Sequence, residues 1–259
     1  MRRILVVGNW KMNLNTSQAS LLVHRLQERI RIYRDIEVVL APSMLTLQPL
    51  SLQIDRRKFR LAAQNAYSRD EGAFTGEVSF NMLRDLVHYV IVGHSERRYI
   101  FNEDLDMVRD KVAAAVRNGI APILCVGETA QERKDGETKQ VLHDELMTAL
   151  SNLTAREVSQ IVIAYEPVWA IGAGEVAKPD QVDEAIKYIR RYINDVFGPK
   201  AAKTVRVLYG ASVEPETIWG LLNIGGVDGL LIGGASLNYH KFSGIVSAVN
   251  RWQRNKEEA

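Results

Sequence analysis

The chain has 259 residues, of which 46% are hydrophobic and 25% charged, and its formal net charge is +2. This composition suits a globular protein with a large core and gives no signal of a polyanion-binding surface, so nucleic acid is not an expected partner. The N-terminal apolar run ends at Gly8, too early for a signal peptide, and no apolar stretch approaches the roughly 18 residues that cross a bilayer. The single cysteine, Cys125, cannot form an intramolecular disulfide. We therefore expect a cytoplasmic protein with no membrane partner.

Short apolar runs rich in β-branched residues recur along the chain, separated by segments of helical length. Continuous apolar runs of this kind are typical of parallel strands covered on both faces. They predict eight strands, at 4–8, 37–41, 60–64, 89–93, 122–126, 161–165, 205–209 and 229–233.

Three of the intervening segments carry clear helix signals. Segment 16–30 spaces leucines at helical intervals and is expected to begin with a Ser/Thr cap. Segment 105–119 ends in Asn118-Gly119, and segment 178–198 has a proline near its start and a glycine past its end. Eight such βα units without a Pro/Ser-rich linker favour an α/β protein with a single (β/α)8 barrel, 1–259 being one domain. The alternative is an open, doubly wound sheet.

In a (β/α)8 barrel the functional side chains lie at the C-terminal ends of the strands. The residues that directly follow the predicted strands should therefore gather on one rim. They include a lysine, a histidine, several carboxylates and glycine-rich segments: Asn9, Lys11, Gln64, Asn65, His94, Ser95, Glu96, Glu128, Glu166, Ser212, Gly233 and Gly234.

Glu166 ends an apolar strand, which is an unusual place for a carboxylate. It could simply pair with a nearby lysine or arginine. Alternatively, it is a general base, because limited water disfavours its charged form and makes it more basic. Pro167 stiffens the chain after it, and the small residues of AIGAGE (170–175) suit a lid that excludes water.

His94 follows Gly93 at the end of a strand, and Ser95-Glu96 could begin a helical turn. Backbone N–H groups at such a turn favour a neutral imidazole, which can donate an N–H to a carbonyl oxygen. A metal site is not indicated, because no second ligand stands at a suitable spacing. Lys11, on the same rim, would be an electrostatic partner for an anionic substrate.

Two glycine-containing segments, YGAS (209–212) and IGGAS (232–236), follow the last two strands. Paired loops at this place are the usual phosphate site of the barrel architecture. Gly233 and Gly234 allow backbone N–H groups to approach an anion, and a short helix from Ala235 would add its dipole. Cys125 is expected to be a buried small hydrophobe rather than a nucleophile.

Seven motifs, in this order and at these spacings, closely resemble triosephosphate isomerases, and the likeness extends over about residues 4–250. The motifs are GNWKMN, AAQNAY, GAFTGEVS, GHSERR, CVGE, AYEPVWAIG and GGASL. The resemblance implies an intramolecular oxidoreductase of glycolysis and gluconeogenesis. It would interconvert dihydroxyacetone phosphate and D-glyceraldehyde 3-phosphate through an enediolate, without metal or cofactor.

The resemblance also implies a role for each matched residue. Glu166 would move the proton between the two carbons, and His94 would polarise the carbonyl. Asn9 and Lys11 would stabilise the enediolate, with Glu96 as a supporting carboxylate. The substrate and its phosphate would be held by Asn9, Lys11, Gly172, Ser212, Gly233 and Gly234.

The resemblance further implies a homodimer, with the loop 66–79 inserted beside the partner's active site. Phe74 near the tip of this loop would then contact the partner, whereas in a monomer it would fold back onto its own chain. The interface would include Phe74, Thr75, Gln64 and Asn65.

The sequence departs from the family pattern at two places. Ala211 stands where the family usually has a second glycine, and it would cost roughly 1 kcal/mol if that position needs a positive φ. Glu175 stands at the far end of the lid, where the family usually has lysine. Two alternatives remain open: another phosphate-binding barrel isomerase that acts on a longer substrate, and a barrel retained as a scaffold without catalysis.

Overall fold

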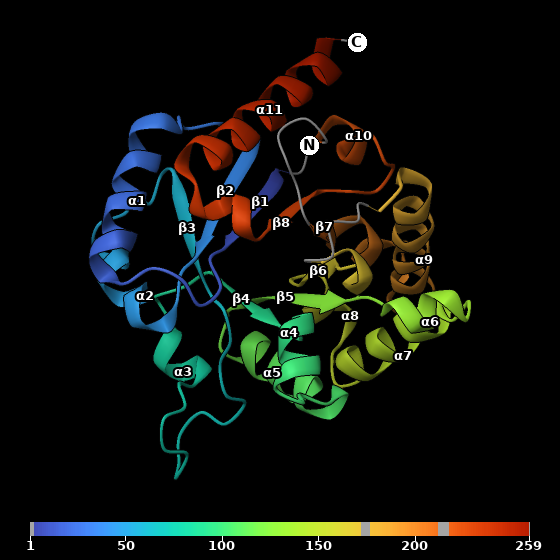
Figure 1. Ribbon diagram of the computed structural model, residues 1–259. Helices are drawn as coiled ribbons and strands as arrows, with labels where there is room; N and C mark the ends of the chain where they lie inside the picture. The colour runs from blue at the N-terminus through green and yellow to red at the C-terminus, as the bar shows by residue number, and fades with distance from the viewer. Residues whose placement is uncertain (1–2, 172–176, 212–217, 259) are drawn as a thin grey trace.

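Eight parallel strands close into a barrel in the computed structural model, which describes residues 3–171, 177–211 and 218–258 (Figure 1). Each strand pairs with the next along the chain, and the last pairs with the first. The closed ladder rules out the doubly wound alternative and confirms all eight predicted strands, whose ends shift by at most two residues. The strands are β1 Ile4–Asn9, β2 Ile36–Ala41, β3 Phe59–Ala63, β4 Tyr89–Val92, β5 Ala121–Val126, β6 Val162–Tyr165, β7 Arg206–Ala211 and β8 Gly229–Ile232.

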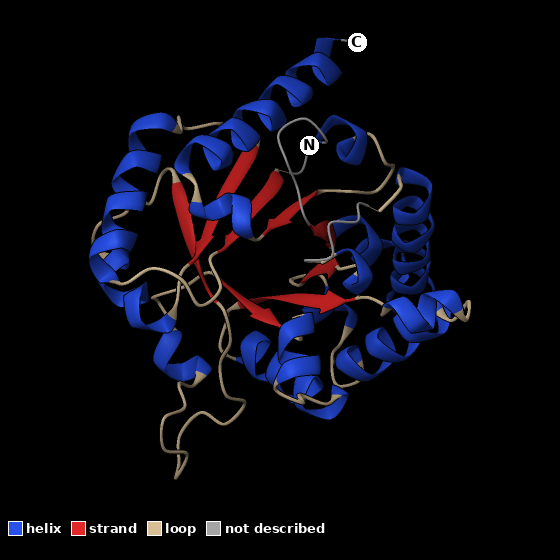
Figure 2. Ribbon diagram, in the orientation of Figure 1, coloured by secondary structure: helices blue, strands red, loops and turns tan. Residues whose placement is uncertain are grey.

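Helices surround this barrel and cover its outer face (Figure 2). In the described parts of the chain the α-helices are α1 Thr16–Arg29, α2 Met44–Ser51, α3 Phe80–Leu83, α4 Ser95–Ile100, α5 Leu105–Arg117, α6 Ala130–Lys134, α7 Thr138–Leu150, α8 Ala155–Val158, α9 Pro179–Thr204, α10 Ile218–Leu222 and α11 Tyr239–Glu258. Two 3-10 helices, η1 Val168–Ala170 and η2 Gly234–Leu237, follow β6 and β8. Over the described segments, none of the helices is long and apolar enough to pass through a bilayer.

Two layers of apolar side chains hold the barrel together. Alternate residues of each strand point to opposite faces, so Leu5 and Val7 of β1 join a cluster inside the barrel, while Val6 joins the larger cluster beneath the helices. Cys125 belongs to the inner cluster and is buried, which confirms the prediction that it packs as a small hydrophobe. Both faces of the strands are therefore covered, as their continuous apolar runs predicted.

The helix ends agree with the sequence signals except at the start of α1. The expected Ser/Thr cap is wrong. The Asn15 side chain instead accepts from the Gln18 N–H, and the Gln18 side chain accepts from the Asn15 N–H. Asparagine is as good an N-cap as serine, and here it caps the helix one residue before Thr16. Gly198, with φ 84°, ends the long first part of α9 as expected, and a short helix continues to Thr204.

Candidate active site

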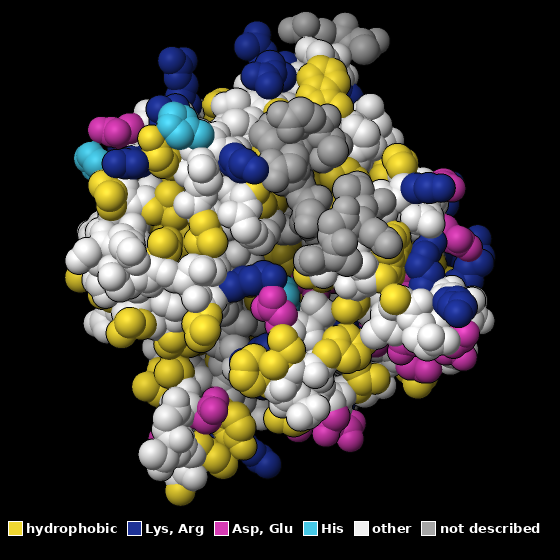
Figure 3. Space-filling view, viewed as in Figure 1, with side chains coloured by type: hydrophobic (Ala, Val, Ile, Leu, Met, Phe, Trp, Pro, Cys, Tyr) yellow, Lys and Arg dark blue, Asp and Glu magenta, His cyan; other side chains and the backbone are white. Residues whose placement is uncertain are grey.

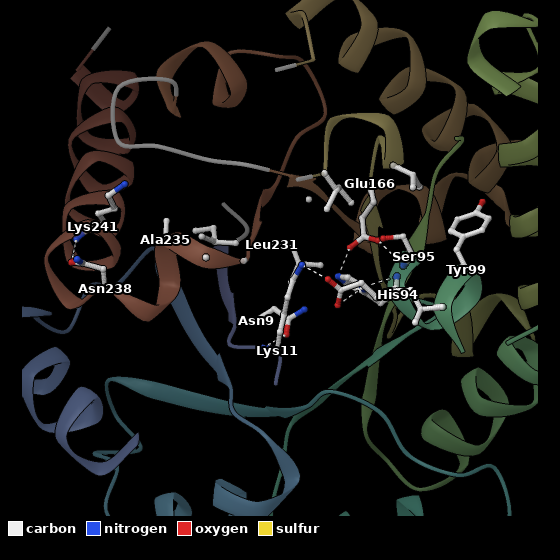
Figure 4. A pocket seen from close by; sticks show the side chains of 18 residues that line it. Asn9, Lys11, His94, Ser95, Tyr99, Glu166, Leu231, Ala235, Asn238 and Lys241 are labelled. Carbon is white, nitrogen blue, oxygen red and sulfur yellow. Dashed lines mark hydrogen bonds and ion pairs between the residues drawn. The ribbon is translucent and has the colours of Figure 1, made fainter. Parts of the chain in front are cut away.

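A cavity of about 770 Å³ opens at the C-terminal ends of the strands. Figure 3 shows basic, acidic and histidine side chains gathered in the hollow at the centre of this face. The cavity is lined by residues at or just after the ends of β1, β4, β6, β7 and β8, among them Asn9, Lys11, His94, Ser95, Glu96, Glu166, Gly210, Gly233 and Gly234 (Figure 4). Most of the residues predicted for the active rim are thus brought together. The predicted phosphate-binding residues Gly172 and Ser212 lie outside the described residues, as does Glu175.

Glu166 and His94 face each other in this cavity. Nε2 of His94 lies 3.3 Å from Oε1 of Glu166, and the Ser95 N–H donates to Oε2 of Glu166 over 3.2 Å. Glu166 is 2% exposed and His94 6% exposed, so water has little access to either group. The alternative that Glu166 simply pairs with a lysine or arginine does not hold among the described residues, since the partners shown are a histidine and a backbone amide.

The hydrogen bonds of His94 define its tautomer. His94 is the N-cap residue of α4, and its Nδ1 accepts from the Glu96 N–H over 3.2 Å. A ring nitrogen that accepts a hydrogen bond carries no proton, so the ring is neutral and its hydrogen is on Nε2. The Nε2–H group then points at Glu166 and into the cavity, where it can donate to a substrate oxygen.

Lys11 is held in an uncommon backbone conformation, with φ 54°. The left-handed region costs a residue with a side chain about 1 kcal/mol, so neighbouring contacts must hold it there. The Lys11 N–H donates to Oδ1 of Asn9 over 3.1 Å, and Nε2 of Gln64 donates to the Lys11 carbonyl over 2.9 Å. Nζ of Lys11 lies 2.5 Å from Oε1 of Glu96. These contacts direct the ammonium group into the cavity.

Gln64 was predicted at a subunit interface, and the contacts that the structure shows for it lie within the chain. Its amide bridges the carbonyls of Lys11 and Ala41, which connects the ends of β1 and β2. Asn65 accepts a hydrogen bond from Nζ of Lys111 over 2.8 Å. Neither Gln64 nor Asn65 is among the described residues that line the cavity. Gln64 therefore acts on the site through the Lys11 backbone.

Two glycines, to which the sequence assigned no role beside Glu166, leave room for that residue. A Cβ on Gly210 would lie 3.1 Å from Cγ of Glu166, and a Cβ on Gly127 would lie 1.8 Å from the Glu166 carbonyl oxygen. Gly127 also has φ 157°. Spacing along the chain could not reveal these positions, because Glu166 reaches them only when the barrel closes.

The predicted phosphate end of the site contains Gly233 and Gly234, just before and at the start of η2. A Cβ on Gly234 would meet no atom within 4 Å, so its backbone is open to the cavity. Asn238 and Lys241 also line this end, and Figure 4 shows them beside Ala235. Neither residue was predicted from the sequence. Ala211, as the last residue of β7, pairs with Ile232 in the parallel ladder, an extended conformation in which alanine is not strained.

Glu128 was placed on the rim, but it is not among the described residues that line the cavity. It is fully buried and accepts hydrogen bonds from Nε1 of Trp169 over 3.0 Å and from the hydroxyl of Tyr165 over 3.1 Å. Arg133 pairs with it over 2.9 Å. Glu128 therefore anchors η1, the segment directly after Glu166, where the lid was expected to begin.

In the described ranges, no three His, Cys, Asp or Glu side chains are grouped closely enough to hold an ion. Cys125 lies deep in the barrel, where burial raises the pKa of its thiol well above the usual range. A thiol kept protonated in this way is a poor nucleophile.

The sequence is similar to known proteins over nearly the whole chain. Residues 4–249 match the family model described as "Triosephosphate isomerase". Curated proteins named triosephosphate isomerase are similar over 95% of this chain. The protein from Syntrophotalea carbinolica is 43% identical with 98% of its own length covered, and that from Dehalococcoides mccartyi is 42% identical with 96% covered. The protein from Clostridium botulinum is 40% identical over its full length.

Proposed function

Because the chain belongs to the triosephosphate isomerase family, we propose that it interconverts dihydroxyacetone phosphate and D-glyceraldehyde 3-phosphate. One observation supports the assignment of this activity to particular residues. The buried Glu166 carboxylate lies beside the Nε2–H group of a neutral His94, in a cavity that also contains Lys11. A base, a hydrogen-bond donor and a fixed cation are the groups needed to move a proton next to a carbonyl.

Glu166 is the base in this proposal. It removes a proton from the carbon next to the carbonyl and returns it to the neighbouring carbon. Burial strengthens its electrostatic interactions with the reacting atoms, and the Ser95 N–H keeps the carboxylate on the side of His94. Gly210 allows the side chain to lie where it does, because any Cβ at that position would press on it.

His94 is the electrophile. Its Nε2–H group donates to the carbonyl oxygen as negative charge develops there, and it exchanges that proton between the two oxygens of the enediolate. The Glu96 N–H holds Nδ1 and so keeps the ring in the required tautomer. An imidazole fixed in this way needs no reorientation during the reaction.

Lys11 and Asn9 supply the electrostatic stabilisation. The ammonium group of Lys11 is held over the cavity by Glu96, and a Cβ on Gly233 would lie 3.5 Å from Cε of Lys11. The cation is therefore close to the glycine backbone that the proposal assigns to the phosphate. One charge can then favour binding of the dianionic substrate and stabilise the enediolate.

We further infer that two copies of the chain form a homodimer. Large apolar side chains are exposed in the segments that follow β1 to β4, four neighbouring strands of the barrel: Met12, Met44, Leu45, Phe74, Met82, Ile100 and Phe101. The loop of residues 66–79 stands away from the barrel (Figure 1). Phe74 in this loop is 39% exposed, and the centroid of its ring lies 4.6 Å from that of Tyr67. A second copy covering this side would bury that apolar surface.

The proposed place of action is the cytoplasm, where the phosphorylated trioses of glycolysis and gluconeogenesis occur. The two alternatives, an isomerase of longer sugar phosphates and a barrel without catalysis, are not favoured by the family match over residues 4–249.

The deciding experiment is steady-state isomerisation of D-glyceraldehyde 3-phosphate in a coupled assay with the purified protein. The proposal expects a kcat/KM of about 10⁷–10⁸ M⁻¹s⁻¹, close to the diffusional range. A folded protein without turnover of either triose phosphate would overturn it. Turnover of a longer sugar phosphate in place of the triose would support the first alternative.

A further inference from the structure

A buried ion pair connects the chain segment that carries His94 to Gly127, the residue on which Glu166 packs. Arg98 of α4 pairs with Glu145 of α7, and their side chains are 7% and 8% exposed. Neither is among the described residues that line the cavity, so neither is placed to touch a substrate. We propose that Arg98 and Glu145 form a positioning clamp that fixes His94 relative to Glu166 during the reaction. The inference deepens the proposed isomerase function and rests on it.

The first half of the clamp holds His94 by its backbone. Nε of Arg98 donates to the Gly93 carbonyl over 2.9 Å. That carbonyl belongs to the same peptide group as the nitrogen of His94. The Arg98 backbone N–H donates to the His94 carbonyl over 3.1 Å. Arg98 therefore fixes the peptide groups on both sides of His94, and these set the direction in which its ring leaves the chain.

The second half of the clamp holds Gly127 against the base. Oε2 of Glu145 accepts from the Gly127 N–H over 2.7 Å, and Nη2 of Arg98 donates to the Gly127 carbonyl over 3.4 Å. Both peptide groups of Gly127 are thus held by the pair. The backbone of Glu166 packs directly on Gly127, and the Glu166 N–H donates to the carbonyl of the preceding Val126 over 2.8 Å.

The clamp thus joins the ends of β4 and β5, at Gly93 and Gly127. No sequence pattern around either glycine indicates this contact. Loss of the pair would let Gly93 and Gly127 move independently, and with them the electrophile and the base. Proton transfer depends steeply on such distances, so a small displacement should affect the chemical step more than substrate binding.

A similar arrangement at the other end of the strands provides a matched control. Nη1 of Arg190 donates to the Val205 carbonyl over 2.7 Å, and its guanidinium pairs with Asp228. Oδ2 of Asp228 accepts from the Val207 N–H over 3.0 Å. This pair also holds backbone groups at strand ends, but β7 and β8 begin there and the cavity lies at their far end. Its loss should therefore affect stability without affecting the chemical step.

Single substitutions would not separate positioning from stability. Glu145→Leu would leave a buried guanidinium without its counter-charge. Arg98→Met would remove the cation from a carboxyl whose pKa burial already raises to about 7. The double variant Arg98→Met/Glu145→Leu removes both charges, and apolar replacement of a buried ion pair often leaves a protein folded. Arg98→Lys is the second variant, because lysine keeps the charge but cannot bond Gly93, Gly127 and Glu145 together.

The test compares kcat, KM and Tm of Arg98→Met/Glu145→Leu, Arg98→Lys and the control Arg190→Met/Asp228→Leu with those of the wild type. For the two Arg98 variants the proposal expects kcat to fall by about tenfold or more with KM within about twofold, since a misplacement of about 1 Å can cost about 10²-fold in rate. The control should change Tm and leave kcat within about twofold, the usual result away from a reacting site.

Wild-type kcat in either Arg98 variant would overturn the clamp, as would an equal loss of kcat in the control. If the double variant does not fold, Arg98→Lys decides between the same two outcomes. The wild-type assay tests the isomerase function by itself. Should the wild type show no turnover, the ¹⁵N resonances of the His94 ring still test the clamp. They should shift in Arg98→Lys and stay unchanged in the control, and unchanged resonances in Arg98→Lys would overturn it.

Discussion

Nε2 of His94 lies 3.3 Å from Oε1 of Glu166, and both side chains are almost completely buried. They follow β4 and β6, which are separated by β5 in the barrel. A donor and a base at this separation can act on the oxygen and the neighbouring carbon of one small substrate.

Glu166→Asp should lower kcat by about 10²-fold, because the carboxylate retreats by one methylene, a shift on the order of 1 Å. KM should change little, since the base contributes mainly to the transition state. Steady-state kinetics in both directions check this. Glu184→Asp on α9, 62% exposed at its side chain, is the control and should behave as wild type. A change confined to KM would contradict the role of Glu166 as base.

Lys11→Ala should raise KM and also lower kcat, by about 10²-fold, because its charge acts on both the bound substrate and the enediolate. The KM of the wild type should rise with ionic strength more than that of the variant. Lys139→Ala removes an exposed lysine paired with Glu184 and serves as the control. Kinetics of Lys11→Ala equal to those of the control would reduce Lys11 to a surface residue.

Gly210→Ala should lower kcat by about tenfold, because the new Cβ would lie 3.1 Å from Cγ of Glu166 and displace the base by a few tenths of an ångström. Thermal unfolding should show a Tm close to that of the wild type. Gly220→Ala on α10 meets no atom within 4 Å and should leave kcat unchanged. Equal kcat in the two variants would mean that the base tolerates the added methyl group.

Phe74→Asp should shift the protein from dimer to monomer, because a carboxylate cannot be buried in an apolar interface without a partner. Light scattering coupled to size exclusion gives the mass directly. Ile32→Asp replaces another exposed apolar side chain, in the segment before β2 at the opposite end of the barrel, and should remain dimeric. A dimeric Phe74→Asp variant would place the interface elsewhere.

Cys125 should not react with a thiol reagent in the native protein at pH 8. Burial raises the pKa of its thiol, so the reactive thiolate is scarce, and the side chain is 2% exposed. In denaturant the reagent should titrate one thiol per chain, since the sequence has one cysteine. Rapid labelling of the native protein would show that the barrel interior opens on the timescale of the reaction.

The sequence by itself determined the strands, the barrel and the identity of most groups at the cavity. Apolar runs and helix signals are local features of the sequence. Eight predicted strands that alternate with helices are compatible with few architectures. Because parallel strands end on one rim, Glu166, His94 and Lys11 could be assigned to one site before their distances were known. The start of α1 shows the limit of local signals, since Asn15 caps the helix in place of the expected Ser/Thr.

Only the tertiary structure decided how these groups are held. The tautomer of His94, the bridge from Gln64 to Lys11, and the space that Gly127 and Gly210 leave for Glu166 all involve distances of a few ångströms. Except for the Glu96–His94 hydrogen bond, these contacts join residues far apart in the chain. No periodic pattern in the sequence predicts contacts of this kind. Closure of the barrel creates them by bringing the ends of β1, β3, β4, β5, β6 and β7 to a common rim, where packing and hydrogen bonding select one arrangement.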